Sequence, residues 1–148
     1  MEMNNDHNQL ELRIEAKLEN LSVIADFISS SMSQLGIDAD VLEVQMAVDE
    51  ACTNIIEYAY SGEGGIINIT CDVWDNNFVV TIRDKGKPFD PSSVPPPSLE
   101  ADLEKRRIGG LGIYLMRKFM DDVSYSFDAE KGNTLVMRKM LTGKMQKR

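Results

Sequence analysis

Hydrophobic and charged residues alternate from position 10 to position 17, the first clear pattern along the chain. Four apolar side chains there are separated by charged ones: Leu10, Leu12, Ile14 and Ala16. A period of two is typical of a strand with one buried face. From Leu21 to Leu35 the apolar residues recur at helical spacing instead, which predicts a helix that ends at Gly36.

A second helix is predicted from about residue 40 to Tyr60. Asp38 or Asp40 can cap its first turn, because a carboxylate oxygen there accepts hydrogen bonds from backbone N–H groups that lack a partner. The glycines from Gly62 onward end the helix. Its apolar residues fall within one half of the helical circumference, so that half is expected to face the core.

Four further strands are predicted in two hairpins. The first hairpin pairs the alternating runs on either side of a polar turn at residues 75–77, and the second closes at residues 131–133. A third helix, beginning near Gly110, separates the two hairpins. This order predicts an α+β two-layer sandwich, with helices packed on one face of a mainly antiparallel sheet.

The chain of 148 residues is predicted to form a single domain. Residues 85–107 lack periodicity and contain all the prolines of the chain. A long irregular loop inside a compact domain usually has a function, so we expect this one to act as a lid. Residues 1–8 and 142–148 are polar and are expected to be loose ends.

Composition and charge exclude several classes of function. The formal net charge of -8 argues against nucleic-acid binding, which depends on clustered lysine and arginine. With two cysteines and one histidine, neither a zinc site nor a disulfide framework is expected. The start of the chain is unlike a signal peptide, and no apolar run is long enough to cross a membrane, so a cytoplasmic protein is expected.

The polar half of the second helix carries the first candidate site. Glu50 and Asn54 are four residues apart, which places a carboxylate beside an amide on one helix face. The carboxylate can act as a base towards water or a hydroxyl, and the amide oxygen can bind a hard cation such as Mg²⁺. By periodicity alone, an ordinary solvated face is the commoner explanation.

A second candidate site directly follows a predicted strand. Asp84 stands at the strand end, where a fixed carboxylate can accept a hydrogen bond from an exocyclic amine. Gly86, two residues later, lets the backbone approach a flat ring closely. Taken alone, the segment is also typical of an ordinary turn.

The third and fourth candidate sites are glycine turns. Gly110 and Gly112 open a helix, where free backbone N–H groups and the helix dipole favour an anion. Arg106 and Arg107 lie just before them and can pair with phosphate oxygens. Thr134 follows the glycine of the last predicted hairpin. Alone, each of these turns is weak evidence for binding.

The order of these sites resembles that of the GHKL ATPase superfamily, and within it the anti-sigma-factor serine kinases. The resemblance covers residues 10–141, and its best-matched segments are 48–54, 84–91 and 110–112. It implies a Bergerat-type ATP-binding fold with ATP and Mg²⁺ as cofactors. Pro88 departs from the wider superfamily, which often has a second glycine there, although proline suits the anti-sigma branch.

The resemblance also implies a role for each candidate residue. Glu50 would be the general base and Asn54 the Mg²⁺ ligand. Asp84 would accept from the adenine amino group, with Gly86 against the ring and Thr134 supporting through its hydroxyl. The remaining contacts would be to the phosphates: Gly110 and Gly112 framing them, and Arg107 or Arg106, if either, at the γ-phosphate.

The predicted function is that of an ATP-dependent serine kinase and anti-sigma factor. By the resemblance, it would phosphorylate an anti-anti-sigma protein of the STAS type and sequester a sigma factor, without binding nucleic acid directly. The alternative is a non-catalytic module whose binding of a partner protein is gated by ATP. Glu50 favours the kinase, because binding alone needs no base. Whether the chain forms a homodimer is left open.

Overall fold

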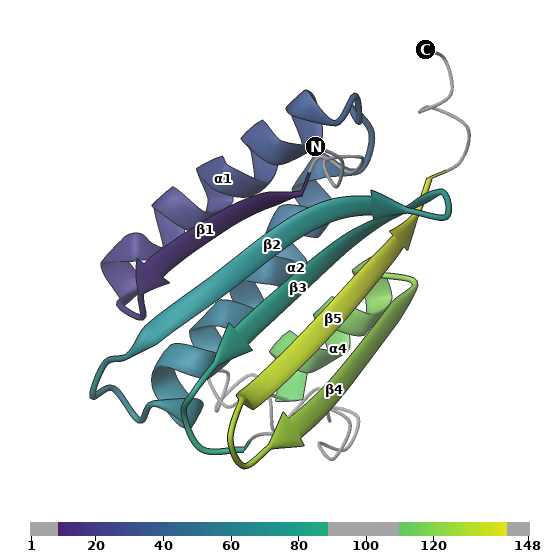
Figure 1. Cartoon of the computed structure of the whole chain (residues 1–148). Helices are drawn as coiled ribbons and strands as arrows, with labels where there is room; N and C mark the ends of the chain where they lie inside the picture. The colour runs from purple at the N-terminus through teal and green to yellow at the C-terminus, as the bar shows by residue number, and fades with distance from the viewer. Residues whose placement is uncertain (1–8, 89–109, 142–148) are drawn as a thin grey trace, which may run out of the picture.

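The computed structural model describes residues 9–88 and 110–141, and its elements follow the predicted order (Figure 1). The strands are β1 (Leu10–Glu15), β2 (Ile66–Trp74), β3 (Asn77–Asp84), β4 (Asp122–Asp128) and β5 (Gly132–Met140). The helices are η2 (Leu18–Asn20), α1 (Leu21–Gln34), α2 (Val41–Asn54), η3 (Ile55–Ala59) and α4 (Gly110–Phe119). The single domain stays a prediction, and most of the predicted lid at residues 85–107 lies outside the described residues.

All strand pairs are antiparallel, and the strands lie in the order β1-β2-β3-β5-β4. The three α-helices cover one face of this sheet, with α2 between α1 and α4 (Figure 1). The predicted α+β two-layer architecture is therefore confirmed. In the described ranges no helix is long and apolar enough to span a membrane.

The core lies between the sheet and the helices, where the period-two and helical patterns meet. Ile67, Ile69 and Cys71 of β2 alternate with polar residues and are fully buried against the helices. From α2, Val44 and Val48 are also fully buried, as expected for residues on one side of a helix. The alternation in the sequence thus assigns each strand residue to the helix-covered face or to the outer face.

Residues with positive φ mark two boundaries between elements. Asp75 and Asn76 have φ values of 53° and 62°, the left-handed conformation that a tight two-residue hairpin turn requires. The turn is one residue shorter than predicted, because Asn77 already pairs in β3. Asp40 precedes α2 as predicted, but with φ 63° its side chain makes no capping hydrogen bond.

Candidate nucleotide and phosphoryl-transfer site

Asp84 is a buried carboxylate at the end of β3, with 5% of its surface exposed. Its Oδ1 atom accepts two hydrogen bonds of 2.8 Å, from the Gly86 backbone N–H and from Asn133 Nδ2. No hydrogen bond to its Oδ2 atom is found in the described part of the chain. The carboxylate is thus anchored through one oxygen, and its other oxygen is left for a ligand.

Burial dominates the electrostatics of this carboxylate. Desolvation raises the pKa of Asp84 above its ordinary value, while the hydrogen bonds from Asn133 and Gly86 lower it and partly offset that effect. A buried carboxylate that retains an unused oxygen strongly favours a ligand with a hydrogen-bond donor.

Asn133 positions both Asp84 and the loop that follows it. It lies directly opposite Asp84 in the β3–β5 register and is 3% exposed. Besides Asp84, its Nδ2 donates to the carbonyl oxygens of Gly86 at 3.1 Å and Lys87 at 3.2 Å. The Tyr125 hydroxyl donates to Asn133 Oδ1, which fixes the orientation of the amide.

The loop after Asp84 also packs against the end of the helix that carries Asn54. The Lys87 backbone N–H donates to the Ala59 carbonyl oxygen of η3 at 2.8 Å. A Cβ atom on Gly86 would lie 2.5 Å from both the carbonyl carbon and the oxygen of Ala59. The structure shows that the missing side chain of Gly86 makes room for η3, and the predicted position of Gly86 against a flat ring stays a prediction.

Replacing Gly86 with alanine is therefore expected to separate the loop from η3. The new methyl group would overlap backbone atoms, which cannot yield as a flexible side chain does, so we expect a loss of about 1–3 kcal/mol in the free energy of unfolding. Urea denaturation measures this loss. Lys87→Ala is the control, because it keeps the backbone N–H and removes only an exposed side chain. Equal stability of G86A and the parent would contradict the close packing.

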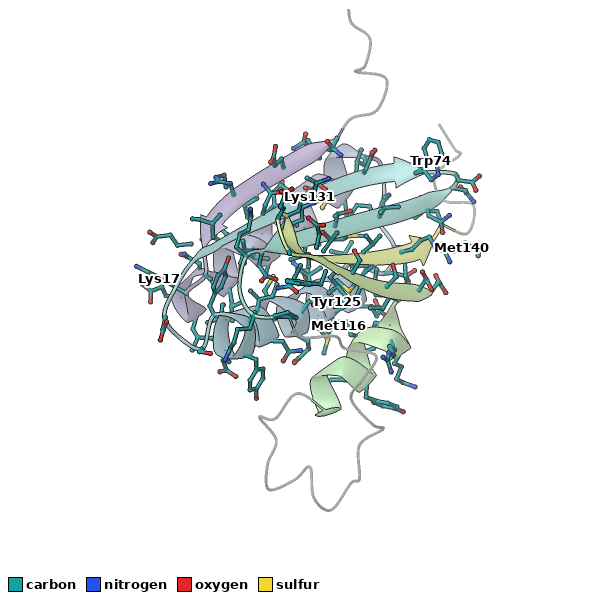
Figure 2. The ribbon with its side chains drawn as sticks, turned by 60° about the horizontal axis from the view of Figure 1, so that its bottom comes forward. Lys17, Trp74, Met116, Tyr125, Lys131 and Met140 are labelled. Atoms are coloured by element: carbon teal, nitrogen blue, oxygen red, sulfur yellow. The ribbon has the colours of Figure 1, made fainter. Side chains whose placement is uncertain are left out.

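Asn54 ends α2 and is buried, with 6% of its surface exposed. Its Nδ2 atom has no hydrogen-bond partner among the residues that the structure describes. It lines one cavity together with Asp84, Asn133, Tyr125 and Met116. Figure 2 shows Tyr125 and Met116 close together between the sheet and the helices. A solvated helix face therefore does not explain Asn54, whose buried amide requires a polar partner.

Glu50 lies one helical turn before Asn54 and is half-buried. It lines a separate, open hollow between α1 and α2, with Ala25, Gln45, Met46 and Asp49. The pKa of Glu50 is raised, first by burial and then by the negative charges of Asp49 and Glu57. A carboxylate with a raised pKa holds a proton more firmly and is a stronger base when ionised.

The structure brings together some of the predicted site residues and not others. Asn54 and Asp84 share the cavity, and Gly110 and Gly112 lie in the first turn of α4. Thr134 lies on the outer face of the sheet, because its neighbours Asn133 and Leu135 are the residues that line the cavity.

Thr134 is therefore on the opposite face from the Asp84 carboxylate that its hydroxyl was predicted to support. Asn133 occupies the position opposite Asp84. The sequence contained the signal for this. Leu135 and Met137 are the apolar residues on which the prediction of this strand rests, and period-two alternation places Asn133 on their face, opposite to that of Val136. Arg106 and Arg107 lie outside the described residues, so a contact from either to phosphate stays a prediction.

A preformed metal site is not evident. No group of three or more His, Cys, Asp or Glu side chains that could hold a metal ion is found within residues 9–88 and 110–141.

Comparison with known proteins agrees with this geometry. Residues 14–139 match the histidine kinase-like ATPase domain. The serine-protein kinase RsbW of Bacillus cereus (strain AH820) is 31% identical over 138 residues, covering 90% of this chain and 85% of the relative. The serine-protein kinase RsbW of Listeria innocua is 32% identical over 144 residues, covering 93% and 90%. The chain belongs to the histidine kinase-like ATPase domain family.

Proposed function

We propose that this protein is an ATP-dependent serine kinase that phosphorylates a small partner protein. One observation carries the proposal: Asp84, anchored through one oxygen, shares a cavity with Asn54, and within the described residues neither Asp84 Oδ2 nor Asn54 Nδ2 has a hydrogen-bond partner. The similarity to proteins named serine-protein kinases supports the type of reaction. The half-buried Glu50 one turn from Asn54 supplies a base.

Asp84 would recognise the nucleotide base. Its free oxygen can accept from the exocyclic amine of adenine, while guanine presents a carbonyl oxygen at that ring position. The cavity as it stands has a volume of about 30 Å³, the space of one or two water molecules. Nucleotide entry would therefore displace lining side chains, and Met116 is the most adaptable of these because methionine is long and unbranched.

Asn54 would bind the Mg²⁺ ion that accompanies the phosphates. An amide offers an oxygen for a hard cation and an N–H group for a phosphate oxygen, so a bound nucleotide would satisfy the atom that now lacks a partner. When bound, Mg²⁺ would neutralise charge on the phosphates. The N-terminus of α4, with Gly110 and Gly112, would face the phosphates with backbone N–H groups.

Replacing Asn54 with alanine is expected to weaken the contribution of Mg²⁺ to nucleotide binding. In the parent, MgCl₂ should tighten ATP binding measured by calorimetry; in N54A this gain should fall by about tenfold, roughly the loss of one charge-assisted contact. Adenosine, which carries no phosphates, should bind both proteins alike. A full Mg²⁺ effect in N54A would remove Asn54 from the metal site.

Glu50 would take the proton from the serine hydroxyl of the partner. The hollow that it lines is open to solvent, so a protein segment can reach it without entering the nucleotide cavity. A hydroxyl is a weak nucleophile at neutral pH, and a carboxylate within hydrogen-bond distance strengthens it by accepting the proton. The serine oxygen would then bond to the γ-phosphorus of ATP as the bond from that phosphorus to the bridging oxygen breaks and ADP leaves.

The partners proposed here follow from the family resemblance. They are an anti-anti-sigma protein of the STAS type as the phosphorylated substrate and a sigma factor as the sequestered protein, both met in the cytoplasm. The alternative function is an ATP-gated binding module without catalysis, which would need Asp84 and Asn54 but not Glu50. Incubation with Mg-ATP and each candidate partner, followed by intact-mass measurement, separates the two. A partner that binds but never gains one phosphate would favour the module.

A further inference from the structure

The outer face of the sheet, which none of the described helices covers, carries a row of cationic and polar side chains across its strands. The β1–β2–β3 register aligns Arg13 with Asn68 and Asn68 with Arg83. Thr134 of β5 continues the same row beside Arg83. Side chains at paired positions of neighbouring strands stand on the same face, so these residues form one continuous polar surface.

At the end of β3 this row opens into a groove. Its lining includes Arg13, Asn68, Arg83, Lys85 and Lys131, which together we name the basic groove. Figure 2 shows Lys131 at the turn that joins β4 to β5. The four cationic side chains are exposed, and none forms an ion pair within the described residues. Lys85 Nζ makes a long contact of 3.5 Å with the Glu130 carbonyl oxygen.

The floor of the basic groove is held in place by Tyr60. Its hydroxyl donates to the Ile66 carbonyl oxygen at 2.7 Å and accepts from the Lys85 backbone N–H at 2.8 Å. Its ring lies over Gly65, where a Cβ atom would come within 2.3 Å of the ring carbons Cε1 and Cζ. The groove is therefore a fixed feature of the fold and not a gap between flexible side chains.

The charge of the basic groove is opposite to that of the protein. The whole chain has a formal net charge of -8, yet this groove gathers four cations. Two acidic side chains flank Arg13 on the same face of β1, and both have partners: Glu11 Oε2 accepts from Asn68 Nδ2 at 2.6 Å, and Glu15 Oε1 lies 3.2 Å from Lys17 Nζ. Asp84 borders the groove, but its carboxylate is buried on the helix-covered side with Asn133.

We propose that the basic groove docks an acidic segment of a partner protein. Arg13 and Arg83 stand on strands two apart, about 10 Å from each other at the backbone, so together they suit several separate carboxylates better than one small anion. Exposed cations without ion pairs attract such a segment at little desolvation cost. Nucleic acid fits less well, because its dense phosphates would be repelled by the net negative charge of the chain.

Arg13 and Arg83 lie on the face of the sheet opposite the nucleotide cavity, although Asp84 lines both hollows. The test of the docking surface therefore uses the full chain without ATP. The probe is a fluorescein-labelled peptide of alternating glutamate and alanine, and binding is followed by fluorescence anisotropy at low ionic strength. We expect saturable binding that weakens as salt is added. The same peptide with glutamine in place of glutamate should not bind.

The double variant Arg13→Gln with Arg83→Gln should bind the glutamate peptide about tenfold more weakly, since two exposed charge contacts are lost. The matched control is Arg117→Gln with Lys118→Gln, which removes the same charge from exposed positions on α4 and should bind like the parent. Equal weakening by both double variants would show a non-specific charge effect and overturn the proposal.

Three other outcomes would also overturn it. Tighter binding of single-stranded DNA of similar length than of the glutamate peptide would point to nucleic acid. Displacement of the peptide by inorganic phosphate, but not by chloride at the same ionic strength, would point to a small-anion site. Absence of saturable binding by the parent at low salt would show that the groove docks no acidic segment. None of these results bears on ATP binding or phosphoryl transfer.

Discussion

Glu50→Gln is expected to slow phosphate transfer to the partner's serine by about 10²–10⁴-fold, the usual contribution of a positioned general base. Glutamine keeps the size of glutamate and its ability to accept a hydrogen bond, but it cannot take the proton from the serine hydroxyl. Nucleotide binding should be unchanged, because Glu50 lies in the hollow beside α1 and does not line the cavity that contains Asp84. Single-turnover kinetics followed by intact-mass measurement would report the transfer rate.

The control for this change is Glu43→Gln, on the same helix two turns before Glu50. Glu43 is partly exposed and lines neither the cavity nor the hollow. E43Q removes the same charge and should transfer phosphate at the parent rate. If E50Q transfers as fast as E43Q, Glu50 is not the base.

The pH dependence gives a second readout for Glu50. The transfer rate should fall as pH drops through its raised pKa, because the protonated carboxyl cannot accept the serine proton. The charge of Glu57 contributes to that raised pKa, so Glu57→Gln should lower the pKa and move the acid limb of the profile to lower pH. If the acid limb of the pH–rate profile lies at the same pH in E57Q as in the parent, that limb does not report the protonation of Glu50.

The fold could be predicted from the sequence because its signals are local. Alternation sets the strands, and helical spacing sets α1 and α2. What the sequence did not reveal depends on contacts between distant segments. The closure of the loop onto η3 joins Lys87 to Ala59, and no local pattern specifies that pairing. The π-helical geometry of η3, which ends the helix begun by α2, was likewise not predicted.

The candidate site was predicted where a residue type itself carries the chemistry. Asp84 and Asn54 were chosen as a carboxylate and an amide, and the structure places both in one cavity. The role of Thr134 followed from the family resemblance alone, which does not specify the face of the strand on which that residue lies. Period-two alternation places Asn133, and not Thr134, on the face of Asp84. The side-chain amide of Asn133 is hydrogen-bonded to a carboxylate and a tyrosine from two other strands.

Asp84→Asn is expected to weaken ATP binding about 10- to 100-fold, corresponding to roughly 1–3 kcal/mol for the loss of a charged acceptor in a buried site. The substitution can leave the hydrogen bonds within the protein intact and alter only the atom that faces the ligand. The amide oxygen of asparagine can take the place of Oδ1 and keep both hydrogen bonds, from Gly86 and from Asn133. Its NH₂ group then replaces Oδ2 and presents a donor where the adenine amine needs an acceptor. Calorimetry with ATP measures the loss, and Thr134→Val, on the outer face of the sheet, should bind ATP like the parent.

The stability of Asp84→Asn should change in the opposite direction to its affinity. The folded-state pKa of Asp84 is raised, so the native protein binds the proton more tightly than the unfolded chain. Stability is therefore lost as pH rises through the window between the ordinary pKa and the raised one, and at neutral pH the ionised carboxylate lowers stability. Asparagine carries no charge, so D84N without nucleotide should unfold at an equal or higher temperature at pH 7. The difference should shrink below that window, where Asp84 is protonated in both states. A variant that loses both ATP affinity and stability would show that Asp84 holds the fold together and does not serve mainly to bind the nucleotide base.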